Sequence, residues 1–215
     1  MNWLLATSNP HKLAELKAIL GNLAASWDTL ATLDPALAQA LVDPVEDADT
    51  FEGNALLKAR GYAEQTGRTV VAEDSGLEVD ALGGRPGVHS ARYSGVRGPR
   101  CEVDPANNAK LLGELSGVPV ERRGARYVCV IAVVGEAGAE PILARGTFEG
   151  RILLPKEAAD PERPAAGRGS NGFGYDPLFV PAGGDLTAAE LPPEEKNARS
   201  HRAAAAVLLR ERLRA

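Results

Sequence analysis

Two adjacent carboxylates that follow an apolar run are the first residues of this sequence whose types can do chemistry. The segment from Val70 to Gly76 reads Val-Val-Ala-Glu-Asp-Ser-Gly, a pattern typical of a buried β-strand that ends in charged residues. Open α/β sheets bind ligands where their strands end, so Glu73 and Asp74 are candidates for a ligand site. An ordinary turn has the same composition, because Asp bonds its own backbone in turns. From this segment alone both interpretations stay open.

A cation near the N-terminus lies where a helix disfavours it. Residues 7–12 read Thr-Ser-Asn-Pro-His-Lys, in which Asn9 is a good N-cap and Pro10 a good first helical residue. Lys12 then falls in the first turn, where the helix dipole favours anions. A bound phosphate between Lys12 and the helix end would explain its position. A capped surface helix with a solvated lysine is the alternative.

The C-terminal segment repeats this arrangement. Ser200 is a natural N-cap for the Ala- and Leu-rich stretch that follows it, which places His201 and Arg202 in the first turn of the predicted helix. Cations gain little there unless an anion is bound beside them. The two helix starts together therefore favour a ligand that carries phosphate.

An aromatic and glycine-rich turn predicts contact with a flat ligand. Residues 172–177 read Gly-Phe-Gly-Tyr-Asp-Pro and lead into an apolar run. Glycines permit close approach of the backbone, and Phe173 is available to stack on a ring. A strand start that is kinked by glycine and carries core aromatics would look similar.

An acidic run precedes the clearest helix of the sequence. Residues 46–49 read Glu-Asp-Ala-Asp, and Asp49 with Glu52 resembles a capping pair for a helix that ends at Gly67. The acids can be helix-start signals only. One of them can also be a metal ligand, because Mg²⁺ takes carboxylate oxygens from separate elements.

The elements that must position these residues alternate between strand and helix. Strands are predicted from Trp3 to Ala6, in the segment around residues 70–73, and as a hairpin of residues 126–134 and 142–148 with its turn at 135–138. A further helix is predicted from Asp104-Pro105 to Gly117. Residues 22–49 show no clear period, and residues 155–171 read as an exposed, mobile loop. The pattern predicts an α/β protein.

Composition restricts the class of ligand. The chain has 215 residues, 44% of them hydrophobic and 25% charged, with a net charge of -5. This acidity argues against a general nucleic-acid surface, although a local cluster of cations and metal can still bind a small phosphorylated ligand. No apolar run reaches the length of a membrane span, and no signal peptide is evident. Cys101 and Cys129 have no metal-site spacing and suit a reducing cytoplasm.

The ordered motifs resemble the inosine triphosphate pyrophosphatase family, which cleaves dITP, ITP and XTP to the monophosphate and pyrophosphate. The resemblance covers nearly the whole chain and rests on five segments: residues 7–12, 50–55, 73–77, 173–177 and 200–202. It implies a long mixed twisted sheet flanked by helices, in a single domain over residues 1–215 whose two lobes share the sheet around a central nucleotide-binding cleft. It also implies a cytoplasmic homodimer that uses Mg²⁺, with no nucleic-acid or membrane partner.

The resemblance assigns a role to each motif. It makes Asp74 the general base and, with Glu46, a ligand of Mg²⁺. The substrate-binding residues that it implies are Thr7, Ser8, Asn9, Pro10, His11, Lys12, Ser75, Phe173, Gly174, Tyr175, Asp176, Lys196, His201 and Arg202. Two departures stand out: Glu73 occupies a position where many relatives carry a second Asp, and the loop from Pro155 to Asn171 looks longer than in compact relatives.

Two other functions remain open from the sequence. One is a purine-nucleotide binding or sensor protein without turnover, although binding alone does not need an acid that activates water. The other is a pyrophosphatase with a different base preference, such as a pyrimidine-directed enzyme. Donors near the base favour hypoxanthine and xanthine over adenine, because ATP has an amine where these bases carry an oxygen. Guanine shares that oxygen, so weaker discrimination against GTP is expected.

Overall fold

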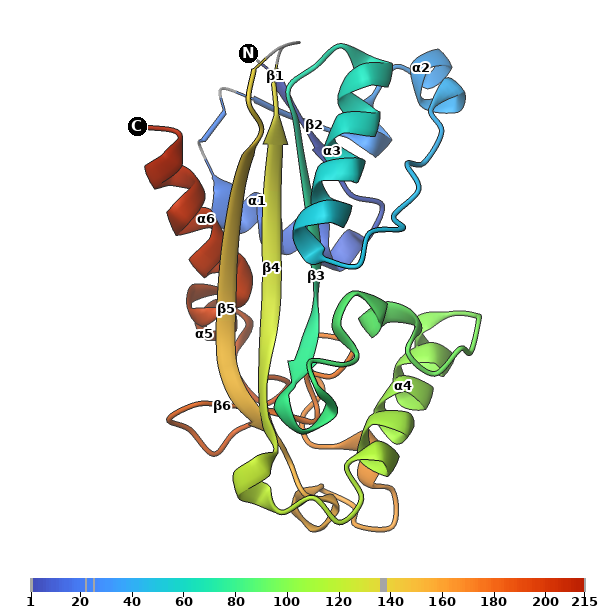
Figure 1. Cartoon of the computed structure of the whole chain (residues 1–215), viewed down its shortest axis with the longest axis vertical. Helices are drawn as coiled ribbons and strands as arrows, with labels where there is room; N and C mark the ends of the chain where they lie inside the picture. Colours follow the sequence, from blue (N-terminus) through green and yellow to red (C-terminus); the bar gives the residue numbers. More distant parts are fainter. Residues whose placement is uncertain (1, 22, 25, 136–138, 215) are drawn as a thin grey trace. The chain divides into compact units, whose positions relative to one another are not determined.

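The computed structural model describes residues 2–21, 23–24, 26–135 and 139–214. Its strands form one mixed, open sheet with flanking helices in the order β2-β1-β3-β4-β5-β6, which confirms the predicted α/β class (Figure 1). The strands are β1 (Asn2–Ala6), β2 (Ser26–Thr29), β3 (Val70–Val79), β4 (Gly124–Val134), β5 (Ile142–Ile152) and β6 (Phe179–Pro181). Strand β1 pairs parallel with β2 and β3, whereas β5 pairs antiparallel with β6.

Six α-helices lie in the described part of the chain. They are α1 (Pro10–Leu20), α2 (Pro35–Ala40), α3 (Phe51–Thr66), α4 (Arg100–Glu114), α5 (Pro193–Arg199) and α6 (His201–Arg212). None of the helices in these ranges is long and apolar enough to span a membrane. The chain divides into two compact units: unit 1 comprises 1–75, 129–146 and 201–215, and unit 2 comprises 76–128 and 147–200.

In unit 1, helices α1 and α6 contact one another and cover one face of the strands. Leu16 of α1 and Leu209 of α6 are fully buried in a cluster with Leu5, Val71 and Ile131 of β1, β3 and β4. Helix α3 contacts β1 and lies across these strands from α1 and α6 (Figure 1). Because successive strand residues point to opposite faces, odd-numbered residues of β3 in this unit face α1 and α6, and even-numbered residues face α3.

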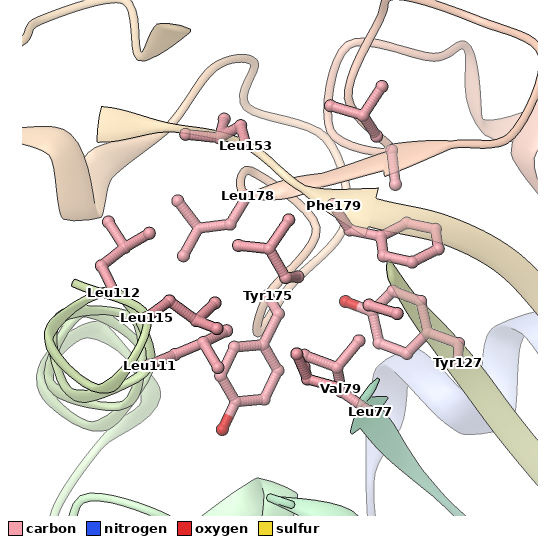
Figure 2. Packing of buried hydrophobic residues seen from close by; sticks show 14 of the residues in the cluster. Leu77, Val79, Leu111, Leu112, Leu115, Tyr127, Leu153, Tyr175, Leu178 and Phe179 are labelled. Carbon is pink, nitrogen blue, oxygen red and sulfur yellow. The ribbon is translucent and has the colours of Figure 1, made fainter. Parts of the chain in front are cut away.

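In unit 2, helix α4 packs through its leucines against side chains from four strands. Leu111 of α4 and Leu115, the residue after its end, belong to a cluster that includes Leu77, Tyr175 and Phe179. Figure 2 shows these side chains converging. Arg123 is buried beside this core, and its guanidinium donates to the carbonyls of three residues, Leu115, Val118 and Leu153. Burial lowers the pKa of this guanidinium, while its bonds tie the end of α4 to the start of β4.

The structure corrects three predicted boundaries. Strand β3 does not end at the acid pair but continues to Val79, because Leu77 and Val79 extend the two-residue alternation of buried side chains. The N-cap of α3 is Thr50 rather than Asp49, since the Thr50 hydroxyl accepts the Gly53 N–H at 3.1 Å. Helix α4 begins at Arg100, so Pro105 lies inside it instead of at its start.

The segments predicted to be irregular contain local structure. Residues 22–49 hold β2 and α2, whose short lengths give too few periods to be detected. Residues 155–171 include two 3₁₀ turns and buried positions such as Ala158 and Gly167, so this segment is only partly exposed. Of the predicted hairpin turn, residues 136–138 lie outside the described residues.

Candidate active site

Glu73 and Asp74 are adjacent in β3 and therefore point to opposite faces of the strand. Glu73 shares the face of Val71 and meets cations from α1 and α6. Asp74 shares the face of Ala72 and meets the polar residues of α3. The two acids thus have separate surroundings, although the sequence presents them as a pair.

Glu73 is the centre of a buried ion network in unit 1. The residue is 2% exposed, and its carboxylate lies 2.6 Å from Lys12 Nζ and 3.3 Å from Arg202 Nε. The Cys129 thiol donates to the same carboxylate at 3.2 Å. Burial raises the pKa of Glu73, but Arg202 and Lys12 outweigh burial and hold that pKa well below its usual range. Glu73 therefore stays ionised at neutral pH.

Asp74 is more weakly compensated. Its Oδ1 accepts the Ser75 N–H at 3.0 Å, and its Oδ2 accepts from Asn54 Nδ2 at 3.2 Å. Burial raises the pKa of Asp74, and the charges of Lys12 and Lys58 only partly offset burial. A carboxylate with a raised pKa is a better proton acceptor than an ordinary Asp, which suits a general base.

Arg202 joins several of the candidate residues in unit 1. Its guanidinium lies 2.8 Å from Glu15 Oε2 and donates to Ser75 Oγ at 2.9 Å. His201 Nε2 lies 3.1 Å from the same guanidinium. Burial lowers the pKa of Arg202, but the neighbouring charges, Glu73 first and Glu15 among them, together outweigh burial and raise that pKa, so the side chain stays a cation. Ser200 precedes α6 in an extended conformation, and its hydroxyl donates to the Asn197 carbonyl.

The turn at residues 7–12 has the local structure predicted for it. Asn9 caps α1 by accepting the N–H groups of His11 and Lys12, and Thr7 Oγ1 accepts the Asn9 N–H at 3.2 Å. The position of Lys12 in the first turn has another explanation than phosphate, because Glu73 is its ion-pair partner. The same applies to Arg202. Substrate binding by Lys12 and Arg202 stays a prediction. One argument for it is removed, because protein carboxylates already compensate both charges.

Glu46 contacts a lysine that sequence analysis did not select. Lys58 Nζ lies 2.8 Å from Glu46 Oε2 and donates to the Glu73 carbonyl at 3.1 Å, and its charge also acts on Asp74. The described residues contain no group of three His, Cys, Asp or Glu side chains that could hold a metal. Mg²⁺ keeps several waters and takes one or two protein carboxylates together with phosphate oxygens, so it does not require a cluster of three side chains.

The aromatic and glycine-rich turn of unit 2 is organised by Asp176. Asp176 Oδ2 accepts the Phe173 N–H at 2.8 Å and lies 2.7 Å from Lys196 Nζ. Gly172 has φ 77°, and a Cβ there would lie 2.1 Å from Asp176 Oδ2, so only glycine fits. The Tyr175 ring lies in the core, and its hydroxyl donates to the Ser90 carbonyl. These contacts hold the turn rigidly.

Cations lie near the ring of Phe173. The Arg100 guanidinium is 4.9 Å and Lys196 Nζ is 5.5 Å from its centroid. The Gly174 N–H donates to Asp104 Oδ2 at 3.0 Å. Phe173 and Gly174 also line a cavity of about 720 Å³, whose other walls come from α4 and the segment of residues 155–171. Both cations are paired with carboxylates, Arg100 with Asp104 at 3.5 Å and Lys196 with Asp176 at 2.7 Å. An aromatic ring with polar groups around it suits a flat ligand.

The sequence matches a known protein family over nearly its whole length. The family model described as the Ham1 family matches residues 3–212. The chain belongs to the Ham1 family. It is 46% identical to the dITP/XTP pyrophosphatase of Pseudomonas syringae pv. tomato, with 98% of this chain and 95% of that protein covered. Its identity to the dITP/XTP pyrophosphatase of Nitratidesulfovibrio vulgaris is 50%, over 93% of this chain and 89% of that protein.

Two solved structures have the same fold as this chain. A HAM1 protein from Coxiella burnetii matches with a TM-score of 0.81 and 37% identity, covering 100% of this chain and 98% of that one. A nucleoside-triphosphatase / dITP/XTP pyrophosphatase from Mycobacterium abscessus matches with a TM-score of 0.72 and 43% identity, over 97% of both chains. The resemblance inferred from five short segments is thereby confirmed.

Several residues that contact the candidate site were not predicted from the sequence. Asn54 and Lys58 lie one helical turn apart on α3, and both touch the segments that carry Glu46 and Asp74. Polar residues four apart on the buried stripe of a helix are a usable signal, because burial without a partner is costly. Glu15 and Cys129 gave no such signal, since their contacts come from other elements.

Proposed function

We propose that this chain hydrolyses dITP, ITP and XTP to the nucleoside monophosphate and pyrophosphate, and so removes non-standard purine nucleotides from the nucleotide pool. The observation that carries the proposal is Asp74, a buried carboxylate whose pKa is raised by burial and only partly lowered by the charges of Lys12 and Lys58. The names of the relatives, which match over nearly the full length, support the same reaction.

Asp74 is the general base in this proposal. A water oxygen bonds to phosphorus, the anhydride bond between the α- and β-phosphates breaks, and Asp74 takes the proton of the water. Lys12 and the helix start at residues 7–12 bind the triphosphate, whose negative charge the N-terminus of α1 favours. Ser75, next to the base, contacts substrate.

Glu46 and Asp74 are the proposed ligands of Mg²⁺. Bound Mg²⁺ would neutralise phosphate oxygens during the displacement. Lys58 pairs with Glu46, and a bound metal would share in neutralising that carboxylate. The Lys58 ammonium would keep its bond to the Glu73 carbonyl. Removal of divalent metal with EDTA should therefore abolish the release of pyrophosphate, and added Mg²⁺ should restore it.

Residues of the aromatic turn are the proposed contacts of the base. Phe173, Gly174, Tyr175 and Asp176 form the turn, with Phe173 stacking on the purine. Lys196, His201 and Arg202 are proposed contacts of the nucleotide, and His201 or Arg202 is the proposed donor to the oxygen that hypoxanthine and xanthine carry where adenine has an amine. ATP presents an amine at that position, so this bond is not made and slower turnover of ATP is expected.

One assay tests the reaction and its base preference together. Rates would be measured on ITP, XTP, dITP, GTP, ATP and dUTP, with separate detection of pyrophosphate and of single phosphates. We expect pyrophosphate from ITP, XTP and dITP, slower turnover of GTP and little of ATP. Preference for dUTP would make the enzyme pyrimidine-directed, and tight ITP binding without a product would make it a binding protein.

Assembly and location complete the proposal. We expect a homodimer, as the family resemblance implies, and light scattering after size exclusion would measure its mass. A cytoplasmic location agrees with two cysteines that are free in the structure, one exposed and one buried. The acidic net charge of -5 disfavours nucleic-acid partners.

A further inference from the structure

Asn54 connects the two segments that carry the proposed metal ligands. Its side chain is buried, with the residue 2% exposed on α3. The amide oxygen accepts the backbone N–H of Ala48 at 2.9 Å, and the amide nitrogen donates to Asp74 Oδ2 at 3.2 Å. The partners fix the orientation of the amide, because a reversed side chain would set N–H against N–H and oxygen against carboxylate.

Close packing reinforces the bond to Ala48. A Cβ on Gly53 would lie 2.5 Å from Ala48 Cβ, so the first turn of α3 packs closely against Ala48, three residues before the helix starts. Thr50 caps this turn through the Gly53 N–H. Ala48 is two residues after Glu46, so the position of the Glu46 backbone depends on this contact.

Asp74 is held at both oxygens. Asn54 occupies Oδ2 and the Ser75 N–H occupies Oδ1, which leaves the carboxylate little freedom to rotate. Asn54 is neutral, so it orients Asp74 without neutralising it. Lys58, four residues later on α3, supplies the charge on the same face.

We propose that Asn54 is a positioning residue that sets the orientation of Asp74 and, through Ala48, the place of Glu46 relative to it. This inference rests on the proposed function, because it needs Glu46 and Asp74 to share a metal. Residues that orient metal ligands typically contribute 10–100-fold to metal affinity or activity. Asn54 would therefore matter to the metal site although it binds neither metal nor substrate.

The experiment compares Asn54→Ala with Asn107→Ala. Asn107 is a matched control: it is 3% exposed on α4, accepts the Ser94 N–H and donates to backbone carbonyls of Ser90 and Ala91. Binding of Mn²⁺ to the nucleotide-free protein would be measured by electron paramagnetic resonance, with Mg²⁺ as competitor. The Mg²⁺ dependence, kcat and KM of ITP hydrolysis and the thermal midpoint would be measured in parallel.

For Asn54→Ala we expect Mn²⁺ affinity and kcat to fall about 10–100-fold, with a smaller change in the KM for ITP. Asn107→Ala should lower the thermal midpoint and leave Mn²⁺ affinity unchanged. Equal thermal losses in both variants with wild-type metal affinity in both would overturn the inference, because Asn54 would then be structural only. Asn54→Leu, which keeps the volume and removes both bonds, replaces Asn54→Ala if that variant does not fold.

The outcome for Asn54 is separable from the outcome for the proposed function. If the wild-type protein released no pyrophosphate from ITP, XTP or dITP, the proposed function would fail. Mn²⁺ binding to wild-type and Asn54→Ala protein would still decide the role of Asn54. Wild-type activity with unchanged Mn²⁺ affinity and kcat in the variant would refute the inference and leave the function intact.

Discussion

At the scale of single residues, the two adjacent acids of β3 have opposite electrostatics. Glu73 has two cations and a thiol around it, so burial does not prevent its ionisation. Asp74 has one amide, one backbone N–H and more distant ammonium groups, so burial raises its pKa. The difference follows from the alternation of strand residues between α1 and α6 on one face and α3 on the other.

Asp74→Asn should separate activity from stability. Loss of a general base lowers the rate of hydrolysis by about 10²–10⁴-fold. Because the folded-state pKa of Asp74 is raised, its charged form opposes folding at every pH above that pKa, and this cost disappears when the pH falls. The metal-free variant should therefore unfold at neutral pH with a free energy equal to or above that of the wild type.

Urea unfolding in EDTA and a pyrophosphate assay in Mg²⁺ check the two parts independently. Wild-type pyrophosphate release by the folded variant would show that Asp74 is not the base. A clear loss of unfolding free energy in EDTA would show that its carboxylate is stabilising, contrary to the direction of its pKa.

Cys129 should stabilise the Glu73 network through its thiol. Burial, and then the neighbouring Glu73 charge, raise the pKa of this thiol well above its usual value, so it stays protonated and donates. Cys129→Ala should lower the free energy of unfolding by about 1–3 kcal/mol, since a buried carboxylate loses a donor. Cys129→Ser keeps a donor and should lose less. Equal losses in urea unfolding would assign the effect to packing instead.

At the scale of elements, β5 and α6 approach so closely that one glycine is required. A Cβ on Gly146 would lie 2.2 Å from Ala205 N and 2.3 Å from His201 O, both backbone atoms. Neither can move without shifting the start of α6, which carries His201 and Arg202. The packing of this helix on the strand is therefore tied to the position of the proposed donors to the base.

Gly146→Ala should destabilise the protein by about 1–3 kcal/mol or more, because overpacking against backbone forces the helix to move. Gly113→Ala is the matched control: Gly113 lies in α4, and a Cβ there meets nothing within 4 Å. It should raise the free energy of unfolding by about 0.5–1 kcal/mol through helix propensity. Thermal unfolding of both variants tests this, and a neutral Gly146→Ala would contradict the packing argument.

Elements with a long, clear period could be predicted from the sequence, and their boundaries less well. Helix α1 begins at Pro10 behind its Asn9 cap as the sequence indicates, because the cap is a local interaction. Helix α4 begins at Arg100, four residues ahead of the predicted cap Asp104. Asp104 accepts the Gly174 N–H, a contact with a distant segment that the local pattern does not show. Strand β2 and helix α2 are too short for a periodicity argument.

At the scale of the whole molecule, the candidate residues divide between the two units. The residues assigned to the phosphates and metal, together with His201 and Arg202, belong to unit 1, and residues 173–176 with Lys196 belong to unit 2. Order along the chain was sufficient to recognise the family, because each motif is local. The contacts of Lys12 with Glu73 and of Asn54 with Asp74 join distant segments, so no local pattern could predict them.

Stability of the whole protein should decrease at alkaline pH because tyrosines are buried with their hydroxyls bonded. Burial, together with the bond to Glu114, raises the pKa of Tyr93 from its ordinary 10.0 to about 12. Lys110 bonds the Tyr93 carbonyl and lies over its ring, and Arg85 pairs with Glu114. The hydrogen-bonded pair of Tyr93 and Glu114 therefore has two cations as neighbours. Burial likewise raises the pKa values of Tyr62 and Tyr175.

A folded-state pKa above the unfolded value means that the contribution of Tyr93 to stability is complete below pH 10 and is lost as pH rises toward about 12. The free energy of urea unfolding should therefore fall through this range, and less steeply in Tyr93→Phe. Absorbance at 295 nm should show that these tyrosines ionise only as the protein unfolds. Ionisation of all tyrosines near pH 10 in protein that is still folded by circular dichroism would contradict the prediction, since the bond of Tyr93 to Glu114 would then not hold its proton.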